Sequence, residues 1–454
     1  MEIPFTFEPL LLFGFLSIML LIGVVLRAKI HFFQKFLFPS CIIGGILGLI
    51  LINIRVINFS ASQLVTFAYH FFNISFISVG LTPSNNRQEN IEHGKDFFKG
   101  PLWMTLVHGV TFTLQAVIGG LFIIIFRIFG LKLFPTFGFL APLGFTEGPG
   151  QALSIGKVWE GFGFEHGGTI GLVFATIGFF FAFFIGIPLV NWGVRNGYST
   201  YTPKTLPQDF LTGIIRKNQK KGVAGALTTH SGNIDTLALQ AALVGLVYVL
   251  TYAFVGSFER FFTPDKAKIL WGFFFIFGLG MAFIIRLLMK KFGVGHLIDP
   301  GIQRRITGWA VDYLIVSTVA AIQILILWRY MLPILIIAFV TGLLTTLIVV
   351  YLGRRIWSYN MERMVFIYGT VTGTVSCGLL LLRVIDPDFK SPVPFEIAVM
   401  NVFSVPIIGS CTVLLNAPLW WDWSVALTVL VFISIMIVCL GAIRIFKLWG
   451  PAKF

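Results

Sequence analysis

The sequence predicts an all-α protein that crosses a membrane many times. Hydrophobic residues make up 57% of its 454 residues and charged residues only 11%, and the mean hydropathy is +0.90. This composition lies far outside that of soluble globular domains. Because a helix needs about 20 apolar residues to cross the hydrocarbon core of a bilayer, apolar stretches of that length predict the spans.

Eleven stretches meet this requirement. They are residues 8–27, 38–57, 62–81, 101–128, 168–193, 235–256, 267–288, 306–326, 331–352, 394–418 and 424–446. Two further apolar stretches, 136–160 and 362–385, are interrupted by glycine and polar residues. Irregular backbone at membrane depth is tolerated only inside protein or along a watery cavity. We therefore expect two re-entrant hairpins, each returning to the side it came from; kinked core helices with small residues for close packing are the structural alternative.

Basic residues set the predicted orientation. The first ten residues carry two glutamates and no Lys or Arg, which does not fit a secretory signal peptide, so the first span is expected to stay in the mature protein. With the N-terminus outside and the C-terminus in the cytoplasm, 25 of the 33 Lys and Arg residues, Arg363 among them, fall on the cytoplasmic side. The other eight are Arg55, Arg127, Lys132, Lys157, Arg260, Lys266, Lys268 and Arg329. The net charge of +14 thus indicates topology in a cell membrane rather than nucleic-acid binding.

The chain divides into two halves around its one long polar stretch. Residues 194–233 read as a cytoplasmic linker. Residues 1–193 and 234–420 each hold four spans, an interrupted segment (136–160 and 362–385) and a fifth span, and they begin on opposite sides of the membrane. This pattern predicts two inverted five-helix repeats, with a binding site near the midplane where they meet. Residues 421–454 add one extra C-terminal span and a tail.

The interrupted segments hold most of the candidate site residues. In the first, Pro149 breaks the helix and glycines permit a tight turn near Glu147. In the second, hydroxyls alternate along "YGTVTGTVSCG". Facing tips would offer helix N-termini to an anion, and carbonyls and hydroxyls to a hard cation such as sodium. The candidates here are Glu147, Gly148, Gly150, Gln151, Thr370, Thr372, Gly373, Thr374 and Ser376.

Polar residues inside other spans complete the candidate set. Asp312 lies in the span 306–326, and an intramembrane acid often marks an ion or proton path. Gln115, Asn73 and Asn401 are further candidates for substrate or ion contacts, although interhelical hydrogen bonds would also account for such residues. For a sodium ion, the expected ligands are Glu147, Asp312 and Thr374.

Other chemistry has no support in the sequence. The chain contains no GxxxxGK[ST] loop, no HExxH motif and no Gly-rich dinucleotide pattern. Its four cysteines show no CxxC spacing, which argues against disulfides and zinc. We therefore expect no enzyme and no cofactor, and an ion gradient as the energy source.

Several runs resemble the sodium/glutamate symporter family. They are "NISFISVGLTPS" (73–84), "LQAVIGGL" (114–121), "TEGPGQAL" (146–153) and "ATIGFFFAFFIGIPLVNW" (175–192), in order and spacing. The resemblance implies sodium-coupled uptake of glutamate by a homodimer in the bilayer, with elevator-like movement of a core against a scaffold. By motif, Gly148, Gly150 and Ala152 match the first hairpin of the family, Gln115 its fourth-span glutamine and Gly373 a glycine of the second hairpin.

One departure from the family bears on the substrate. The family commonly carries a Gly-His-Gly-Thr run in its first hairpin, where this chain has Glu147, Gly148 and Pro149. An added carboxylate repels a dicarboxylate unless sodium or a proton neutralises it. A related small carboxylate and proton coupling therefore stay open as alternatives, as do a passive channel and a membrane scaffold without transport.

Overall fold

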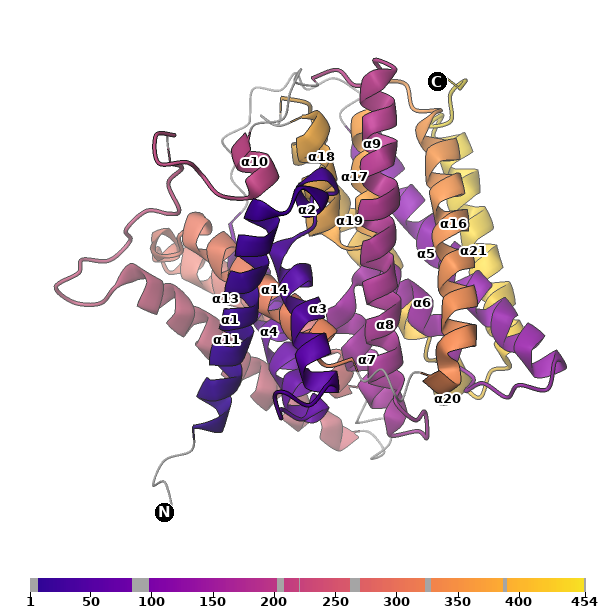
Figure 1. The fold of residues 1–454 in the computed structure, drawn as a ribbon, viewed down its shortest axis with the longest axis horizontal. Coiled ribbons are helices and arrows are strands. Elements are labelled where there is room, and N and C mark those ends of the chain that lie inside the picture. Colours follow the sequence, from indigo (N-terminus) through magenta and orange to yellow (C-terminus); the bar gives the residue numbers. More distant parts are fainter. Residues whose placement is uncertain are drawn as a thin grey trace.

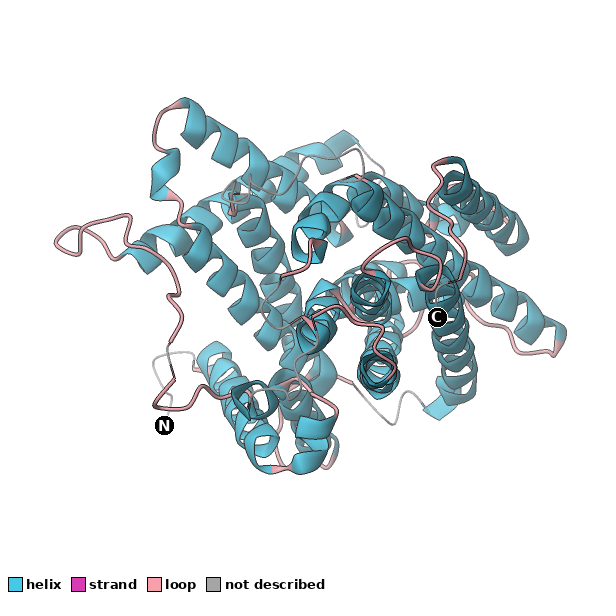
Figure 2. Cartoon of the chain, turned by 90° about the horizontal axis from the view of Figure 1, so that it is seen from above, coloured by secondary structure: helices cyan, strands magenta, loops and turns pink. Residues whose placement is uncertain are grey.

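The computed structural model describes residues 7–83, 98–201, 208–219, 221–261, 270–322, 328–386 and 390–452. Within these ranges the chain contains helices and loops but no strand, as Figure 2 shows from above, so the predicted all-α class is confirmed there. The helices of the first half are α1 (Glu8–Lys29), α2 (His31–Lys35), α3 (Ser40–Asn53), α4 (Ala61–Leu81), α5 (Lys99–Ile128), α6 (Leu140–Pro142), α7 (Pro149–Glu160), α8 (Gly167–Phe180) and α9 (Gly186–Arg195). Those that follow are α10 (Gln208–Thr212), α11 (Thr236–Phe258), α13 (Phe274–Lys291), α14 (Pro300–Ala320), α16 (Met331–Gly353), α17 (Asn360–Thr372), α18 (Val375–Ile385), α19 (Val393–Leu414), α20 (Ala417–Trp420) and α21 (Val425–Ile445).

Seven described helices are long and apolar enough to cross a membrane. They are α1, α4, α5, the continuous helix Gly167–Arg195 (α8 and α9), α11, α16 and α21. Each coincides with a predicted span. The other four predicted spans hold α3, α13, α14 and α19; residues 267–269 and 323–326 of those spans lie outside the described ranges.

Two helix boundaries lie away from the hydropathy limits, one of them because of a local cap. Helix α14 begins at Pro300, six residues before the apolar stretch, because the carboxylate of Asp299 accepts the N–H of Ile302 (2.7 Å) and proline suits the first helical turn. Helix α3 has only 14 residues, and Arg55 takes a left-handed conformation (φ 58°) soon after its end.

The helices form two groups that lie side by side in Figure 1. In the first group α4 packs against α14 and α13, α3 against α1 and α14, and α11 against α13. In the second group α5 packs against α16, α19 and α21, α7 against α8, and α17 against α16 and α18. The groups meet where α7 contacts α4 and α14.

The C-terminal helix α21 belongs to the second group. It lies along α5, where Gly109 faces the thiol of Cys439 and Gly120 contacts Val429. A side chain at either glycine would push the two helices apart. This span therefore packs closely on the rest of the fold.

Candidate functional site between two broken helices

The first interrupted segment is a helix broken at one residue. Short 3-10, α and π-helical turns run from Phe137 to Glu147, and α7 begins at Pro149. Between them Gly148 has φ 88° and ψ −176°, a backbone conformation that is essentially confined to glycine. Pro149 then starts α7 with a fixed φ and no N–H to satisfy. The sequence Glu-Gly-Pro therefore dictates the break.

The two ends of this segment lie close together. The ring of Phe134, just before it, stacks on Phe164, just after it, with centroids 4.7 Å apart and planes 15° apart. Near the end of α7, the indole N–H of Trp159 donates to Oδ1 of Asn416 (2.7 Å), which lies just beyond α19. Both ends are thus held at one end of α8, with Glu147 and Gly148 between them.

The second interrupted segment is broken at Gly373 and Thr374. Helices α17 and α18 pack side by side, so that a Cβ added at Gly369 would lie 2.8 Å from Cα of Gly378. Its ends also meet: Thr200 N–H donates to Oε1 of Glu362 (2.7 Å), and Ser199 Oγ donates to the carbonyl of Ile385 (3.5 Å). Both ends therefore lie at the end of α9.

The two breaks meet inside the second group. A Cβ added at Gly148 would lie 2.7 Å from Cγ2 of Thr374 and 3.5 Å from the carbonyl oxygen of Gly373. A Cβ at Gly178, on α8, would lie 2.7 Å from the carbonyl oxygen of Thr372. Only residues without side chains allow the backbones to come this close.

The N-termini of α7 and α18 lie at this meeting point. Neither has a side-chain cap from the described residues. The first N–H groups of a helix have no partner within the helix, and they carry the positive end of its dipole. Two such N-termini beside one another form a place where an anion is stabilised without a basic side chain.

Gln115 of α5 ties the two breaks together. Its Nε2 donates to the carbonyl of Val371 (2.9 Å) and to Oγ1 of Thr345 on α16 (3.2 Å). Its Oε1 accepts from the hydroxyl of Thr146 (2.8 Å). All four groups are buried, so the amide satisfies groups that the broken helices leave unpaired.

Thr146 and Thr345 were not among the sequence-predicted site residues. Thr146 stands directly before Glu147 in the predicted turn, and this position could have singled it out. Thr345 lies in the middle of an apolar span, where the sequence gives no signal. Its role follows only from the packing of α16 against α5.

Buried polar atoms without partners gather where α4 contacts α7. Phe72 packs on Gly150, and the next residue, Asn73, is fully buried. The Asn73 amide lies beside the hydroxyls of Tyr69 and Tyr248, whereas Oε1 of Gln151 and Oγ of Ser154 on α7 have no hydrogen-bond partner among the described residues. Because buried polar groups are normally hydrogen-bonded, such atoms indicate room for a polar ligand or ion.

Two acids approach the breaks from different sides. Glu147, at the first break, lies near Gln151 and the thiol of Cys411. Asp312 on α14 lies beside the thiol of Cys41, and Cys41 is a neighbour of Cys377. Cys377 in turn accepts from the hydroxyl of Thr374 (3.6 Å). Glu147 thus lies at the first break, whereas Asp312 is exposed on α14 and is linked to the second break only through the two cysteines.

The remaining predicted residues are placed differently. The hydroxyls of Thr370 and Thr372 donate to carbonyls of their own helix, those of Phe366 (3.0 Å) and Tyr368 (2.7 Å). Ser376 is exposed in the first turn of α18, and Asn401 is exposed on α19. The roles of all these residues in binding stay predictions.

The long apolar helices and the paired broken helices describe a multi-pass membrane protein. Residues 7–378 match the family described as sodium/glutamate symporter, and the chain therefore belongs to the sodium/glutamate symporter family. The match contains both breaks and ends at Gly378. No curated protein and no solved structure was found to match.

Proposed function

We propose that the protein is a secondary active transporter that couples sodium entry to uptake of glutamate or a related small carboxylate. Membership of the sodium/glutamate symporter family supports this class. The observation that carries the proposal is the meeting of two uncapped helix N-termini at Gly148 and at Gly373 and Thr374. The N–H groups there would bind the substrate carboxylate.

The co-transported sodium ion would neutralise the acids that lie beside the substrate carboxylate. Glu147 stands at the first break, and Asp312 of α14 lies beside Cys41 of α3. A carboxylate substrate near either acid is destabilised unless positive charge enters with it. Sodium bound by Glu147, Asp312 and Thr374 would supply that charge and make binding of substrate and ion cooperative.

The packing supports inverted repeats with re-entrant hairpins. Helices α1, α3 and α4 of the first half correspond to α11, α13 and α14 of the second, and their contacts are reciprocal: α3 packs on α14 and α13 packs on α4. Each broken segment also has both ends at one place. In this arrangement one hairpin enters from outside and the other from the cytoplasm.

The division into two helix groups supports an elevator-like mechanism. The second group carries both breaks, Gln115 and α21, while α4 and α14 of the first group cover one side of the site. We propose that the second group moves against the first, which forms the contact between two copies of the chain in a homodimer. The N-terminus lies outside and the C-terminus in the cytoplasm of the cell.

Proton coupling is the second candidate, because the site contains two acids that a proton could neutralise instead of sodium. The experiment that separates them is uptake of labelled glutamate by purified protein in proteoliposomes. An inward sodium gradient should drive accumulation above the external concentration, with none in its absence. Accumulation driven by a proton gradient alone would favour the second candidate, and equilibration without accumulation would indicate a channel.

A further inference from the structure

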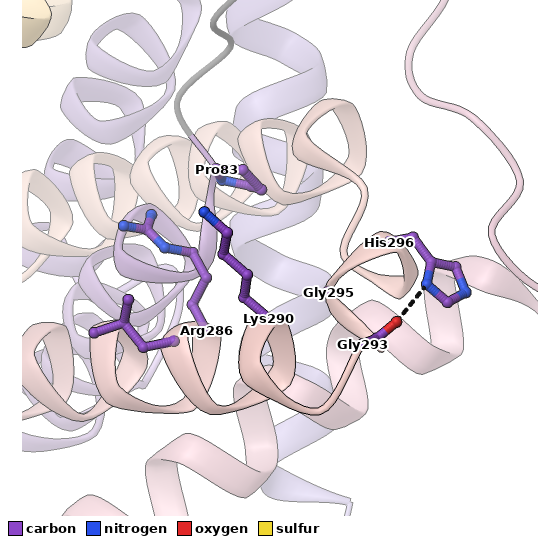
Figure 3. Close-up of a pocket in the computed structure, with 7 residues that line it drawn as sticks. Pro83, Arg286, Lys290, Gly293, Gly295 and His296 are labelled. Atoms are coloured by element: carbon purple, nitrogen blue, oxygen red, sulfur yellow. Dashed lines mark hydrogen bonds between the residues drawn. The ribbon is translucent and has the colours of Figure 1, made fainter.

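A separate cavity of about 520 Å³ opens at the end of α13, in the first helix group. Its walls come from Pro83 after α4, from Arg286, Leu287 and Lys290 of α13, and from the turn 293–296 (Figure 3). None of these residues takes part in the site between the broken helices. In the proposed orientation the cavity faces the cytoplasm.

The cavity is basic. Arg286 and Lys290 project from the same face of α13 toward Pro83 (Figure 3). Arg286 donates one hydrogen bond to the carbonyl of Thr82 (2.6 Å), which fixes the guanidinium while leaving most of its five N–H donors for other partners. Among the described residues, no carboxylate forms an ion pair with Arg286, Lys290 or His296.

The turn after α13 builds the wall opposite these cations. Gly293 has φ 76° and ends the helix, and the N–H of Val294 donates back to the carbonyl of Met289 (2.9 Å). The chain then folds over the helix, so that a Cβ added at Gly295 would lie 3.2 Å from Cα of Lys290. His296, whose Nδ1 lies 3.2 Å from the carbonyl oxygen of Gly293, stands at the rim.

An apolar face of α13 leads directly into the cavity. Leu287, one of its lining residues, is 62% exposed, and Ile284 and Phe283, one turn earlier on the same face, are 50% and 40% exposed. Phe292, at the end of the helix, is 74% exposed. Because this face belongs to a predicted span, it meets acyl chains, and a lipid whose phosphate lies in the cavity would place its own chains along it.

We propose that this cavity binds the headgroup of an anionic phospholipid from the cytoplasmic leaflet. Arg286 and Lys290 hold the phosphate, and an acyl chain lies along Leu287, Ile284 and Phe283. Basic pockets at the cytoplasmic ends of spanning helices suit such headgroups. The bound lipid would stabilise the junction of α4 and α13, which Arg286 already joins.

Thermal stability of the purified protein in detergent tests this proposal without any transport measurement. Phosphatidylglycerol added to the micelles should raise the melting temperature, and phosphatidylcholine with the same chains should not. The double variant Arg286→Gln/Lys290→Gln should need a roughly thirtyfold higher mole fraction for a half-maximal rise, and Lys290→Gln alone about fivefold. Lys290→Arg should match the wild type.

A matched control removes two other charges from the same side. Arg304→Gln/Arg305→Gln, on the exposed face of α14, should leave the response to phosphatidylglycerol unchanged. If phosphatidylglycerol raises the melting temperature of the Arg286/Lys290 double variant as it does that of the wild type, the proposed lipid site is wrong. An equal response to phosphatidylcholine, or to glycerol phosphate alone, would overturn its assignment to an anionic lipid.

Discussion

Gly148 and Thr374 lie in contact although 226 positions separate them in the chain: a Cβ added at Gly148 would lie 2.7 Å from Cγ2 of Thr374. One residue marks the break of the first segment and the other the break of the second. The contact places two helix N-termini at one point.

Gly148→Ala should abolish uptake while the protein still inserts and purifies. The backbone conformation of Gly148 costs about 1–3 kcal/mol for a residue with a side chain, and the added methyl would also displace Thr374. Uptake into proteoliposomes and gel filtration of the same preparation measure the two outcomes. Gly280→Ala is the control, since a Cβ at Gly280 meets nothing within 4 Å. If Gly148→Ala takes up substrate like the wild type, the two breaks have no part in the mechanism. Wild-type uptake by Gly150→Val or Gly373→Val would lead to the same conclusion.

Gln115→Leu should lower both stability and uptake. It leaves the hydroxyl of Thr146 and the carbonyl of Val371 buried without the amide, at a cost of about 1–3 kcal/mol. Thr146→Val should destabilise the Gln115→Leu variant less than it destabilises the wild type, because the hydrogen bond between the two residues can be lost only once. Melting temperatures of the two single variants and the double variant measure this coupling. Strictly additive effects would show that the amide does not join the breaks.

Glu147→Gln should raise the sodium concentration that gives half-maximal uptake, because it removes a charged oxygen beside the site. Uptake measured over a series of sodium concentrations at fixed pH provides the test. The matched control is Glu165→Gln, an exposed acid on the loop after α7. A sodium dependence that Glu147→Gln leaves unchanged would exclude this residue as a ligand.

Arg363→Met should destabilise the protein strongly. Arg363 and Glu396 form a buried, two-pronged ion pair (2.8 and 2.5 Å) that joins α17 to α19. Removing one partner of such a pair costs about 3–5 kcal/mol, whereas replacing both by apolar residues is often nearly neutral. The double variant Arg363→Met/Glu396→Leu should therefore melt close to the wild type. A double variant as unstable as Arg363→Met would contradict this account.

The sequence was most informative where backbone chemistry decides the structure. Glycine and proline at positions 148 and 149 predicted the first break, because few other residues permit it. Composition likewise predicted the helical class and the long apolar helices. Arg363 shows the limit: the sequence predicted only that it lies on the cytoplasmic side, and its buried ion pair could not be predicted because the partner, Glu396, lies on another helix.

Side-chain direction in the second segment could not be predicted from spacing. The alternating hydroxyls were all named as candidate site groups, but a helix repeats every 3.6 residues, so that Thr370 and Thr372 do not share a face. Since α17 continues to Thr372, both hydroxyls bond to helix carbonyls. Thr374, beyond the helix end, is the hydroxyl that reaches the contact with Gly148.

Labelling of introduced cysteines with a membrane-impermeant maleimide tests the central claim, that each broken segment returns to its own side. The native cysteines are buried. The exposed residues Lys132 and Glu165 flank the first segment, and the half-buried Arg355 and the exposed Lys390 flank the second. Lys132→Cys and Glu165→Cys should both label from outside intact cells, and Arg355→Cys and Lys390→Cys only after the membrane is opened. Labelling of the two members of either pair from opposite sides would contradict the account.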